Sequence, residues 1–425
     1  MALSVEPATR GNDLPWLSEQ LDGLMRALVD GGALGLITVE ASVLRQIERR
    51  YGGNVLRGSL KLLVESLLPT LREFLGPEPW VMGQALEPER LLIFTPQPRS
   101  NRSFYTRSLH RLAERVREHV SVAVQRIAYP YLTGIFDIPV GAALVMHRPF
   151  HRPEAEIRRL LASALDDGNH NAEHMRRERG ALLERLIIDE SLSTVYEPVV
   201  SLHDGHVLGY EALTRGPSGG PLSSPMVCFN VAQRCDLDYE LDTVCRRLAL
   251  HNARGLEGRE ILFLNILPSS IHDLDFSESG LQSTLDELSI APAQIVFEVS
   301  ERQTIGNYPR FREAMDRLVD LGFRIAVDDV GSGYSTLETA IELSPDFLKI
   351  DRTLIHHIHE DPQKQEILRG LVRLGVKMKA AVVAEGIESE DEKAVLRELG
   401  VSYGQGYAIG RGRASLTRKK IARAL

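Results

Sequence analysis

The sequence is poor in cysteine, with only three in 425 residues. Cys228, Cys235 and Cys245 are odd in number, and none lies in the Cys-x-x-Cys spacing that is common in structural zinc sites. Small secreted domains that depend on disulfides carry more cysteines than this. The composition therefore excludes a disulfide framework, indicates a reducing compartment, and favours buried or free thiols.

Long apolar runs are also lacking. No segment approaches the roughly 20 apolar residues that a membrane-spanning helix needs. The first residues, MALSVEPATRGNDLPW, have no basic start followed by an apolar core, so they do not resemble a secretory signal. We therefore expect a cytoplasmic protein without a membrane segment.

The basic excess typical of duplex-binding proteins is absent as well. The formal net charge is −8. Residues 1–188 contain 24 basic and 22 acidic side chains, whereas residues 189–425 contain 26 and 36. The acidic second half argues against DNA as a partner. It favours a cleft that holds divalent cations, through which an acidic site can accept a phosphate substrate.

The length and the 43% hydrophobic content predict two or three globular domains. Residues 1–30 are predicted to form a helical arm. Over residues 31–170, short apolar runs alternate with amphipathic helices, which predicts an α/β domain. Residues 171–188 are predicted to form a charged linker helix, which is either a solvated connection or a helix that signals or dimerises. Residues 189–425 form the second large domain.

This second domain contains recurring apolar runs that end in a polar residue. Seven such runs are GYEALTR, ILFLNIL, IVFEVSE, FRIAVDD, FLKID, AVVAEGIE and VSYGQGY. Runs of this kind, separated by helices, are typical of parallel strands covered by helices. Seven or eight such units predict a (β/α)8 barrel, in which the carboxyl ends of the strands meet at one site.

The polar residues at these strand ends form a predicted active-site ring. Its members are Glu211, Asn265, Glu298, Asp328, Asp329, Glu385 and Glu388, with Lys349 and Arg215 as cations. So many carboxylates cannot all ionise in one cleft without further cations. Their oxygens suit Mg²⁺ or Mn²⁺, and adjacent aspartates can bridge two ions that clamp an in-line phosphoryl displacement. The alternative, a solvated rim of surface acids, is disfavoured because each acid ends an apolar run.

The motifs GYEALTR, LNI, FEVSE, DDVGSGYSTL, LKID, AEGIE and GQGY, in this order, resemble the EAL-domain family over about residues 190–412. The resemblance implies a TIM-like barrel that hydrolyses cyclic di-GMP to linear pGpG with two Mg²⁺ or Mn²⁺ ions. It also implies a role for each matching residue. The metal ligands would be Glu211, Asn265, Glu298, Asp328 and Asp329, and turnover would also require Glu211. Glu385 would act as general base or hold a water, and Lys349 would position the water or stabilise phosphate charge. The dinucleotide would be contacted by Arg215, Asp351, Glu388 and Gln405, and Glu301 would anchor the loop that follows Asp329.

Four positions depart from the family pattern. Glu197 stands at a substrate-binding position where Gln is usual, Val330 and Ser332 replace Phe and Thr in the loop, and Gly412 replaces a Pro. These changes keep open a receptor that binds cyclic di-GMP without cleaving it. A protein-interaction scaffold with neither property is a third alternative, which the intact acid ring disfavours.

The first domain resembles, less closely, a degenerate GGDEF domain. The resemblance rests on ITVEASVLRQIERRYGGNVLRGSLKLLVESLLPTLREFLG, on LEPERLLIF (86–94) and on IPVGAALVM. The signature itself is absent, so we expect no cyclase activity. GTP binding, or a purely regulatory or dimerising role, remains open, and the family resemblance implies a homodimer.

Two further features are set apart from the ring. His356, His357 and His359 cluster after FLKID, where a helix surface is expected in preference to a metal site. The basic tail RGRASLTRKKIARAL is expected to be a solvated last helix in preference to a nucleic-acid arm.

Overall fold

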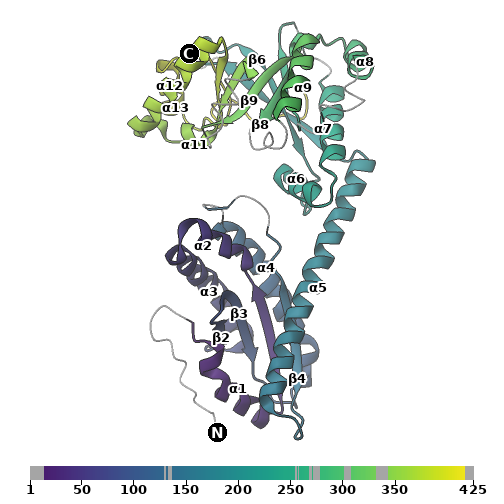
Figure 1. The fold of residues 1–425 in the computed structure, drawn as a ribbon, viewed down its shortest axis with the longest axis vertical. Helices are drawn as coiled ribbons and strands as arrows, with labels where there is room; N and C mark the ends of the chain where they lie inside the picture. The colour runs from purple at the N-terminus through teal and green to yellow at the C-terminus, as the bar shows by residue number, and fades with distance from the viewer. Residues whose placement is uncertain are drawn as a thin grey trace. The chain divides into compact units, whose positions relative to one another are not determined.

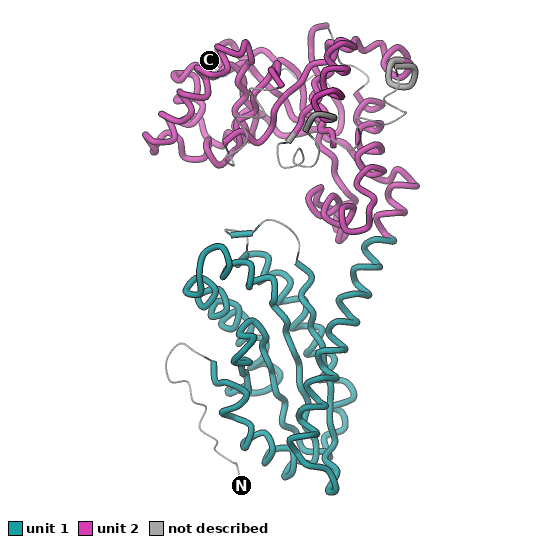
Figure 2. Tube along the Cα trace, in the orientation of Figure 1, with its two compact units in different colours: residues 1–181 teal, residues 182–425 magenta. Residues whose placement is uncertain are grey.

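The computed structural model describes residues 14–128, 131–132, 136–253, 256, 258–267, 270, 278–300, 308–331 and 343–416. Contacts divide the chain into two compact units, residues 1–181 and 182–425 (Figures 1 and 2). The division falls inside one continuous helix, α5 (Pro153–Ile188). The predicted linker helix is therefore the last part of a longer helix that begins in unit 1.

Unit 1 is built on a four-stranded antiparallel sheet of order β2-β3-β1-β4. The strands are β1 (Ala33–Glu40), β2 (Trp80–Gln84), β3 (Glu87–Thr95) and β4 (Val140–Met146). The helices are α1 (Leu17–Gly31), α2 (Arg45–Tyr51), α3 (Gly53–Leu75), α4 (Leu109–Ala128) and the first part of α5, with helical turns at Ser42–Leu44 and Phe104–Ser108.

Helices cover both faces of this sheet. Successive side chains of a strand point to opposite faces, so each strand contributes apolar residues to both layers. On β1, Leu34 and Leu36 pack with α1 and α5. Ile37 and Val39 pack on the other face with α3 and α4. The near-continuous apolar sequence of β1 thus follows from burial on both sides.

Unit 2 contains a closed barrel of strand order β10-β11-β12-β5-β6-β7-β8-β9. The strands are β5 (Ser193–Ser201), β6 (Val207–Arg215), β7 (Ile261–Asn265), β8 (Ile295–Ser300), β9 (Arg324–Val330), β10 (Phe347–Ile350), β11 (Ala381–Ala384) and β12 (Tyr403–Gly404). The helices are α6 (Pro225–Arg234), α7 (Asp238–Asn252), α8 (Glu278–Leu288), α9 (Tyr308–Asp320), α11 (Arg352–Ile355), α12 (Pro362–Met378) and α13 (Glu390–Glu398), with helical turns at Pro292–Gln294 and Ile358–Glu360.

The barrel confirms the predicted fold, with one strand reversed. The seven predicted strands are β6 to β12, and neighbours among them pair in parallel. The eighth strand, β5, pairs antiparallel with both β6 and β12. Only residues 202–206 join β5 to β6, and so short a connection forms a hairpin, since a parallel crossover needs a dozen or more residues.

A small apolar core fills the barrel interior. Val199, Phe263, Val296, Ala326 and Val383, from five different strands, pack together. Two larger clusters lie between the strands and the surrounding helices. The polar side chains of the site described below are therefore held by strands whose other residues are tightly packed. Within the described residues, no helix is both long and apolar enough to cross a membrane.

Candidate active site

The site lies where the parallel strands of the barrel end. Asn265 is the last residue of β7, and Asp328 and Asp329 lie near the end of β9. Lys349 is the third residue of β10, and Glu385 directly follows β11. Since the carboxyl ends of parallel strands meet at one end of a barrel, residues far apart in sequence converge there.

Lys349 is fully buried, and its ammonium group lies among four carboxylates. Nζ is 2.6 Å from Glu298 Oε1 and 2.7 Å from Glu385 Oε1. It is 3.1 Å from Glu211 Oε2 and 3.6 Å from Asp328 Oδ1. One cation therefore joins side chains from β6, β8, β9, β10 and the end of β11.

The charges at this point do not balance. Burial, and then mutual repulsion, raise the pKa of Glu298 and of Glu385 well above the usual value, and they raise the pKa of Asp328. Burial would also raise the pKa of Glu211, but the ammonium of Lys349 holds it below the usual value. Burial would lower the pKa of Lys349, yet the surrounding carboxylates raise it well above its usual value. The cluster is short of positive charge, which bound divalent cations would supply.

Two side-chain amides complete the cluster. Asn265 Nδ2 lies 3.1 Å from Glu298 Oε2 and 3.4 Å from Glu211 Oε1. Gln405 Nε2 donates to Glu211 and lies 3.4 Å from Glu385 Oε1. Gln405 Oε1 is buried and has no hydrogen-bond partner. Both amides thus turn their nitrogen toward carboxylates, which leaves their carbonyl oxygens for another electropositive group.

The donor set fits hard divalent cations. Asp328, Asp329 and Glu385 each offer an oxygen, and these oxygens lie within 4.8 Å of one another. Asn265 links a second group, Glu211 and Glu298, as described above. Carboxylate and amide oxygens are the ligands that Mg²⁺ and Mn²⁺ prefer. The residues present therefore fit the expected metal ions, and an unpartnered amide oxygen and the excess negative charge support that fit.

Glu197 lies opposite Glu211 in the antiparallel pair of β5 and β6. Directly opposed residues of such a pair point to the same face of the sheet. Burial, and then the charge of Glu211, raise the pKa of Glu197. The position predicted to contact substrate is thus next to the acid cluster, and it adds a further carboxylate to it.

Gln405, a predicted substrate contact, is part of the acid cluster, whereas Arg215 and Asp351 have hydrogen-bond partners of their own. Arg215 Nη1 donates to the carbonyl oxygen of Thr214 at 2.8 Å. The Asp351 carboxylate caps the amino end of α11 and accepts from Thr353 N at 2.8 Å. Capping is a structural role that the sequence pattern LKID did not predict.

Glu388 forms an ion pair that the sequence analysis missed. Its Oε1 lies 2.6 Å from Arg352 Nη2. The backbone of Glu388 is held by Glu392, whose Oε2 accepts from Glu388 N at 2.8 Å and from Ser389 N at 3.2 Å. The sequence carries a signal for this arrangement, because Ser389-x-x-Glu392 is a capping box at the start of α13.

The loop after β9 is described only at its beginning. Asp329 and Gly331 have positive φ values of 59° and 102°, and Val330 between them is buried. Glu301, the predicted anchor of this loop, and Ser332 lie outside the described residues. Val330, the departure from the usual Phe, is part of an apolar cluster with Leu348, Ile350 and Leu354.

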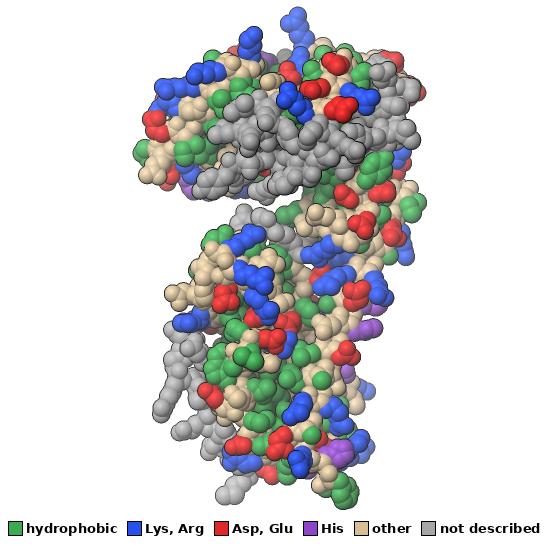
Figure 3. Space-filling view, in the orientation of Figure 1, with side chains coloured by type: hydrophobic (Ala, Val, Ile, Leu, Met, Phe, Trp, Pro, Cys, Tyr) green, Lys and Arg blue, Asp and Glu red, His purple; other side chains and the backbone are tan. Residues whose placement is uncertain are grey.

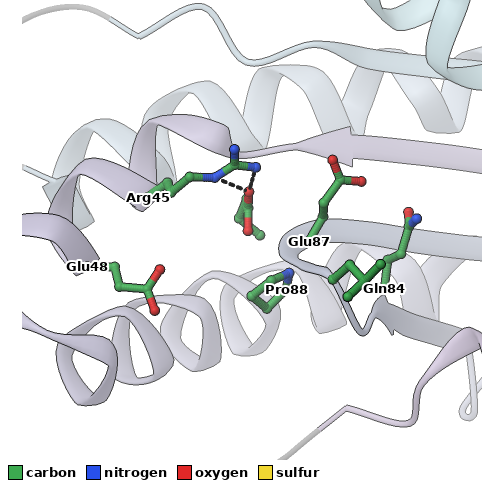
Figure 4. A pocket seen from close by; sticks show the side chains of 7 residues that line it. Arg45, Glu48, Gln84, Glu87 and Pro88 are labelled. Carbon is green, nitrogen blue, oxygen red and sulfur yellow. Dashed lines mark hydrogen bonds and ion pairs between the residues drawn. The ribbon is translucent and has the colours of Figure 1, made fainter.

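Unit 1 has a pocket of its own, of about 560 Å³ (Figure 4). It is lined by Arg45, Glu48, Gln84, Leu86, Glu87, Pro88 and Glu89. The Arg45 guanidinium binds the buried carboxylate of Glu89, with Nε at 2.7 Å from Oε1. The lining carries more carboxylates than cations, and its arginine is already paired. These features give no support to GTP binding, which stays a prediction.

The exposed surface of α5 carries side chains of both signs. Figure 3 shows acidic and basic groups interspersed along this helix. Within it, Arg177 Nε lies 3.0 Å from Glu173 Oε1, one turn apart. Such pairs support a solvated helix, while a signalling or dimerising role stays a prediction.

The sequence profile of the EAL domain matches residues 180–412. The chain belongs to the EAL domain family. An uncharacterized signaling protein of Caulobacter vibrioides is 31% identical over 255 residues, which are 60% of this chain and 31% of that protein. The cyclic di-GMP phosphodiesterase NbdA of Pseudomonas aeruginosa is 30% identical over 54% of this chain and 30% of its own length. The chain spans about a third of the length of these curated relatives.

A solved structure supports the same fold. The Xanthomonas citri FimX EAL domain in complex with c-diGMP aligns with a TM-score of 0.53 at 19% identity, covering 59% of this chain and 99% of that one. At this identity the likeness concerns the fold. It is the second half of the chain, with the barrel, that carries the EAL domain.

Proposed function

We propose that the barrel is a metal-dependent phosphodiesterase that hydrolyses cyclic di-GMP to linear pGpG. The observation that carries this proposal is the buried Lys349 ammonium among the carboxylates of four strands. A solvated rim of acids would not bury a lysine in this way, because a buried charge is costly without a specific arrangement. Membership of the EAL family gives the substrate class.

The metal ligands would be Glu211, Asn265, Glu298, Asp328 and Asp329. When bound, Mg²⁺ or Mn²⁺ would lower the pKa of water and neutralise charge on the phosphate. We propose two ions because the oxygens form two neighbouring groups.

The chain's own residues have separate tasks in this proposal. Glu385 is 17% exposed, whereas Glu298 is fully buried, so Glu385 is the carboxylate better placed to accept a proton from water. Burial, and then the charge of Asp328, raise the pKa of Glu385 above the usual value, so this carboxylate holds a proton more tightly than an exposed glutamate does. Lys349, 2.7 Å from Glu385, holds this carboxylate in place and stabilises negative charge on the phosphate.

Substrate contacts are proposed for Arg215, Asp351, Glu388 and Gln405. Glu388 is paired with Arg352, and Asp351 caps a helix. Arg352 is therefore proposed to orient Glu388 toward the nucleotide.

A receptor without turnover is the second candidate. It is favoured by one observation, the carboxylate of Glu197 opposite Glu211, where it adds negative charge close to the position of a bound phosphate. In this alternative the barrel binds cyclic di-GMP and signals without producing pGpG.

For unit 1 we propose a catalytically inactive, GGDEF-like regulatory role, with GTP as a candidate effector and homodimerisation as a candidate mode of action. The proposal rests on the sequence resemblance over residues 37–76, 86–94 and 138–146. The absence of the signature from the sequence supports the lack of cyclase activity.

One assay separates these candidates. The purified full-length chain is incubated with cyclic di-GMP and Mg²⁺, Mn²⁺ or EDTA, with and without GTP, and products are resolved by chromatography. Metal-dependent pGpG supports the phosphodiesterase, and a change with GTP supports a regulatory first unit. Tight binding without product replaces the enzyme by the receptor.

A further inference from the structure

A second group of metal-ligating side chains lies in the segment between α11 and α12, away from the acid cluster in sequence and in chemistry. His357, His359 and Glu360 each offer one ligand atom, and these atoms lie within 4.8 Å of one another. His357 Nδ1 is 3.9 Å from Glu360 Oε2, and His359 Nε2 is 3.6 Å from Glu360 Oε1. Two imidazoles and one carboxylate thus converge on one point at the surface.

The backbone beneath these side chains is fixed by contacts from two helices, α12 and α13. Glu392 of α13 accepts from His357 N at 2.9 Å. Lys364 Nζ and Gln365 Nε2, both on α12, donate to the carbonyl oxygens of His356 and Ile358 at 2.6 Å and 2.9 Å. The segment is therefore held before any ligand binds, as a preformed site requires.

Two further features fix the directions of the side chains. Ile358, between the two histidines, is fully buried and anchors the turn in the apolar cluster beneath. His357 has a φ of 56°, in the left-handed region that few residues other than glycine adopt. This backbone conformation and the following helical turn place His357, His359 and Glu360 on the same side.

We propose that His357, His359 and Glu360 form a binding site for a divalent transition ion, with Zn²⁺ as the best-suited ion. Neutral imidazole nitrogens suit Zn²⁺, whereas Mg²⁺ and Mn²⁺ prefer oxygens. In a tetrahedral zinc site with bonds of about 2.1 Å, ligand atoms lie roughly 3.4 Å apart. The distances of 3.6 Å and 3.9 Å run to different oxygens of Glu360, and one ligand atom of each residue lies within 4.8 Å of the others. Closing around an ion therefore needs ligand atoms to approach by about 1.4 Å or less, which rotation of the exposed side chains supplies. Water completes the coordination.

This site is chemically distinct from the barrel mouth and does not rest on the proposed function. The competing explanation is a set of surface side chains that pair weakly when a histidine is protonated, since His357 is 60% exposed and Glu360 is 69% exposed. A lone surface histidine also prefers Zn²⁺ over Mg²⁺, but its affinity for Zn²⁺ does not depend on a second imidazole and a carboxylate. The dependence of Zn²⁺ affinity on all three side chains is therefore the property to measure.

The experiment is calorimetric titration of the full-length chain with Zn²⁺. Because the acid cluster also binds cations, the titration is repeated with Asp328→Asn/Asp329→Asn. The proposal predicts that one Zn²⁺ site remains in this variant and that excess Mg²⁺ does not displace the ion from it. Loss of a group that only supports a metal ligand costs about 10–100-fold in metal affinity, so loss of a ligand itself in His359→Ala should weaken this site at least about 100-fold.

Two variants guard against effects on folding. Glu360→Gln keeps the shape of an exposed side chain, and His357→Asn keeps a residue that tolerates the left-handed region. Both should weaken Zn²⁺ binding, and His206→Ala, an exposed histidine paired with Asp204, should not. The proposal is wrong if the Zn²⁺ stoichiometry and affinity are unchanged in His359→Ala and Glu360→Gln. It is also wrong if Asp328→Asn/Asp329→Asn remains folded and binds no Zn²⁺.

Discussion

At the level of single residues, the charge balance of the barrel depends on Lys349. Its ammonium is the cation in contact with Glu211, Glu298, Asp328 and Glu385. Removing one partner of a buried ion pair leaves uncompensated charge and is far more costly than removing an exposed pair.

Lys349→Met should therefore lower the free energy of unfolding by about 3–5 kcal/mol at pH 7 in EDTA. Urea denaturation measures this loss. Lys393→Met is the control, because Lys393 pairs with Glu390 at the surface, and it should cost less than about 1 kcal/mol. Equal, small losses in the two variants would show that the Lys349 cluster is not a tightly coupled unit.

Glu197 adds a carboxylate opposite Glu211, beside the acid cluster. If cyclic di-GMP binds beside Glu211, Glu197→Gln removes a repulsion of about 1 kcal/mol and should lower KM roughly fivefold. Initial-rate kinetics measure the change, and Glu390→Gln on the exposed start of α13 provides a charge-matched control. A KM that rises in Glu197→Gln would mean that this carboxylate accepts a hydrogen bond from the nucleotide instead.

Asp242 on α7 gives a pH-dependent prediction away from the acid cluster. Burial raises the pKa of Asp242 to about 6 in spite of Arg246, whose Nε is 3.1 Å from Oδ2. With an unfolded value of 3.8, the folded protein binds the proton more tightly. The resulting stability is complete below pH 3.8 and is lost as the pH rises through about 6.

Relative to Asp242→Asn, which does not titrate, the wild type should lose roughly 2 kcal/mol of stability between pH 4 and pH 7. Urea denaturation of both proteins across this range measures the difference. Asp204 is a control whose pKa shifts in the opposite direction to that of Asp242. Hydrogen bonds from Ser201 and then His206 lower the pKa of Asp204 to about 2. A pH-independent difference between wild type and Asp242→Asn would mean that Asp242 stays ionised throughout.

At the level of elements, α13 positions part of the site through its amino end. Glu392 accepts hydrogen bonds from the backbone of His357, Glu388 and Ser389. Burial would raise the pKa of Glu392, but these backbone donors hold it below the usual value. The carboxylate thus fixes the segment that carries Glu388.

Glu392→Ala leaves these backbone donors without their acceptor, which should cost about 1–3 kcal/mol of stability. Because Glu388 loses its support, KM for the dinucleotide should rise more than kcat falls. Denaturation and steady-state kinetics measure the two effects. Glu390→Ala, in the same first turn but exposed, should change neither, and similar effects from both variants would remove the positioning role of Glu392.

The sequence predicted the strands that carry the site, because each is an apolar run that ends in a polar residue. It did not predict β5, since STVYEPVVS contains Glu197 and Pro198, which are unfavourable in a central strand. In the barrel the ladder between β5 and β12 consists of the pairs Ser201–Tyr403 and Val200–Gly404, so Pro198 is not required to donate to it. Glu197 can occupy this strand because its side chain lies on the same face as Glu211, at the polar site.

Contacts made by side chains at the site were less predictable than residue types. The pattern indicated that acids and a lysine would meet, and Glu211, Glu298, Asp328 and Lys349 do meet. It could not indicate that Asp351 caps α11, because a cap depends on where the helix begins. The pairing of Glu388 with Arg352 joins two separate elements and depends on their packing.

At the level of the whole molecule, the chain combines two units with different charge and different architecture. Unit 1 has a pocket in which the arginine is already bound to a glutamate and the other charged side chains are acidic. The barrel of unit 2 instead gathers four carboxylates around one lysine, so negative charge is in excess there. The acidic balance of residues 189–425 is thus concentrated in part at the site where cations are needed. This distribution supports the proposal that the barrel acts on a phosphodiester through metal ions.

The central claim is tested most directly by comparing the full-length wild type with Glu385→Gln in one experiment. Cyclic di-GMP binding and pGpG formation are measured in the same samples with Mg²⁺ or Mn²⁺. The account predicts that both proteins bind the dinucleotide and that only the wild type forms pGpG, in a reaction that EDTA stops. Retained pGpG formation by Glu385→Gln, or binding without product in the wild type, would contradict it.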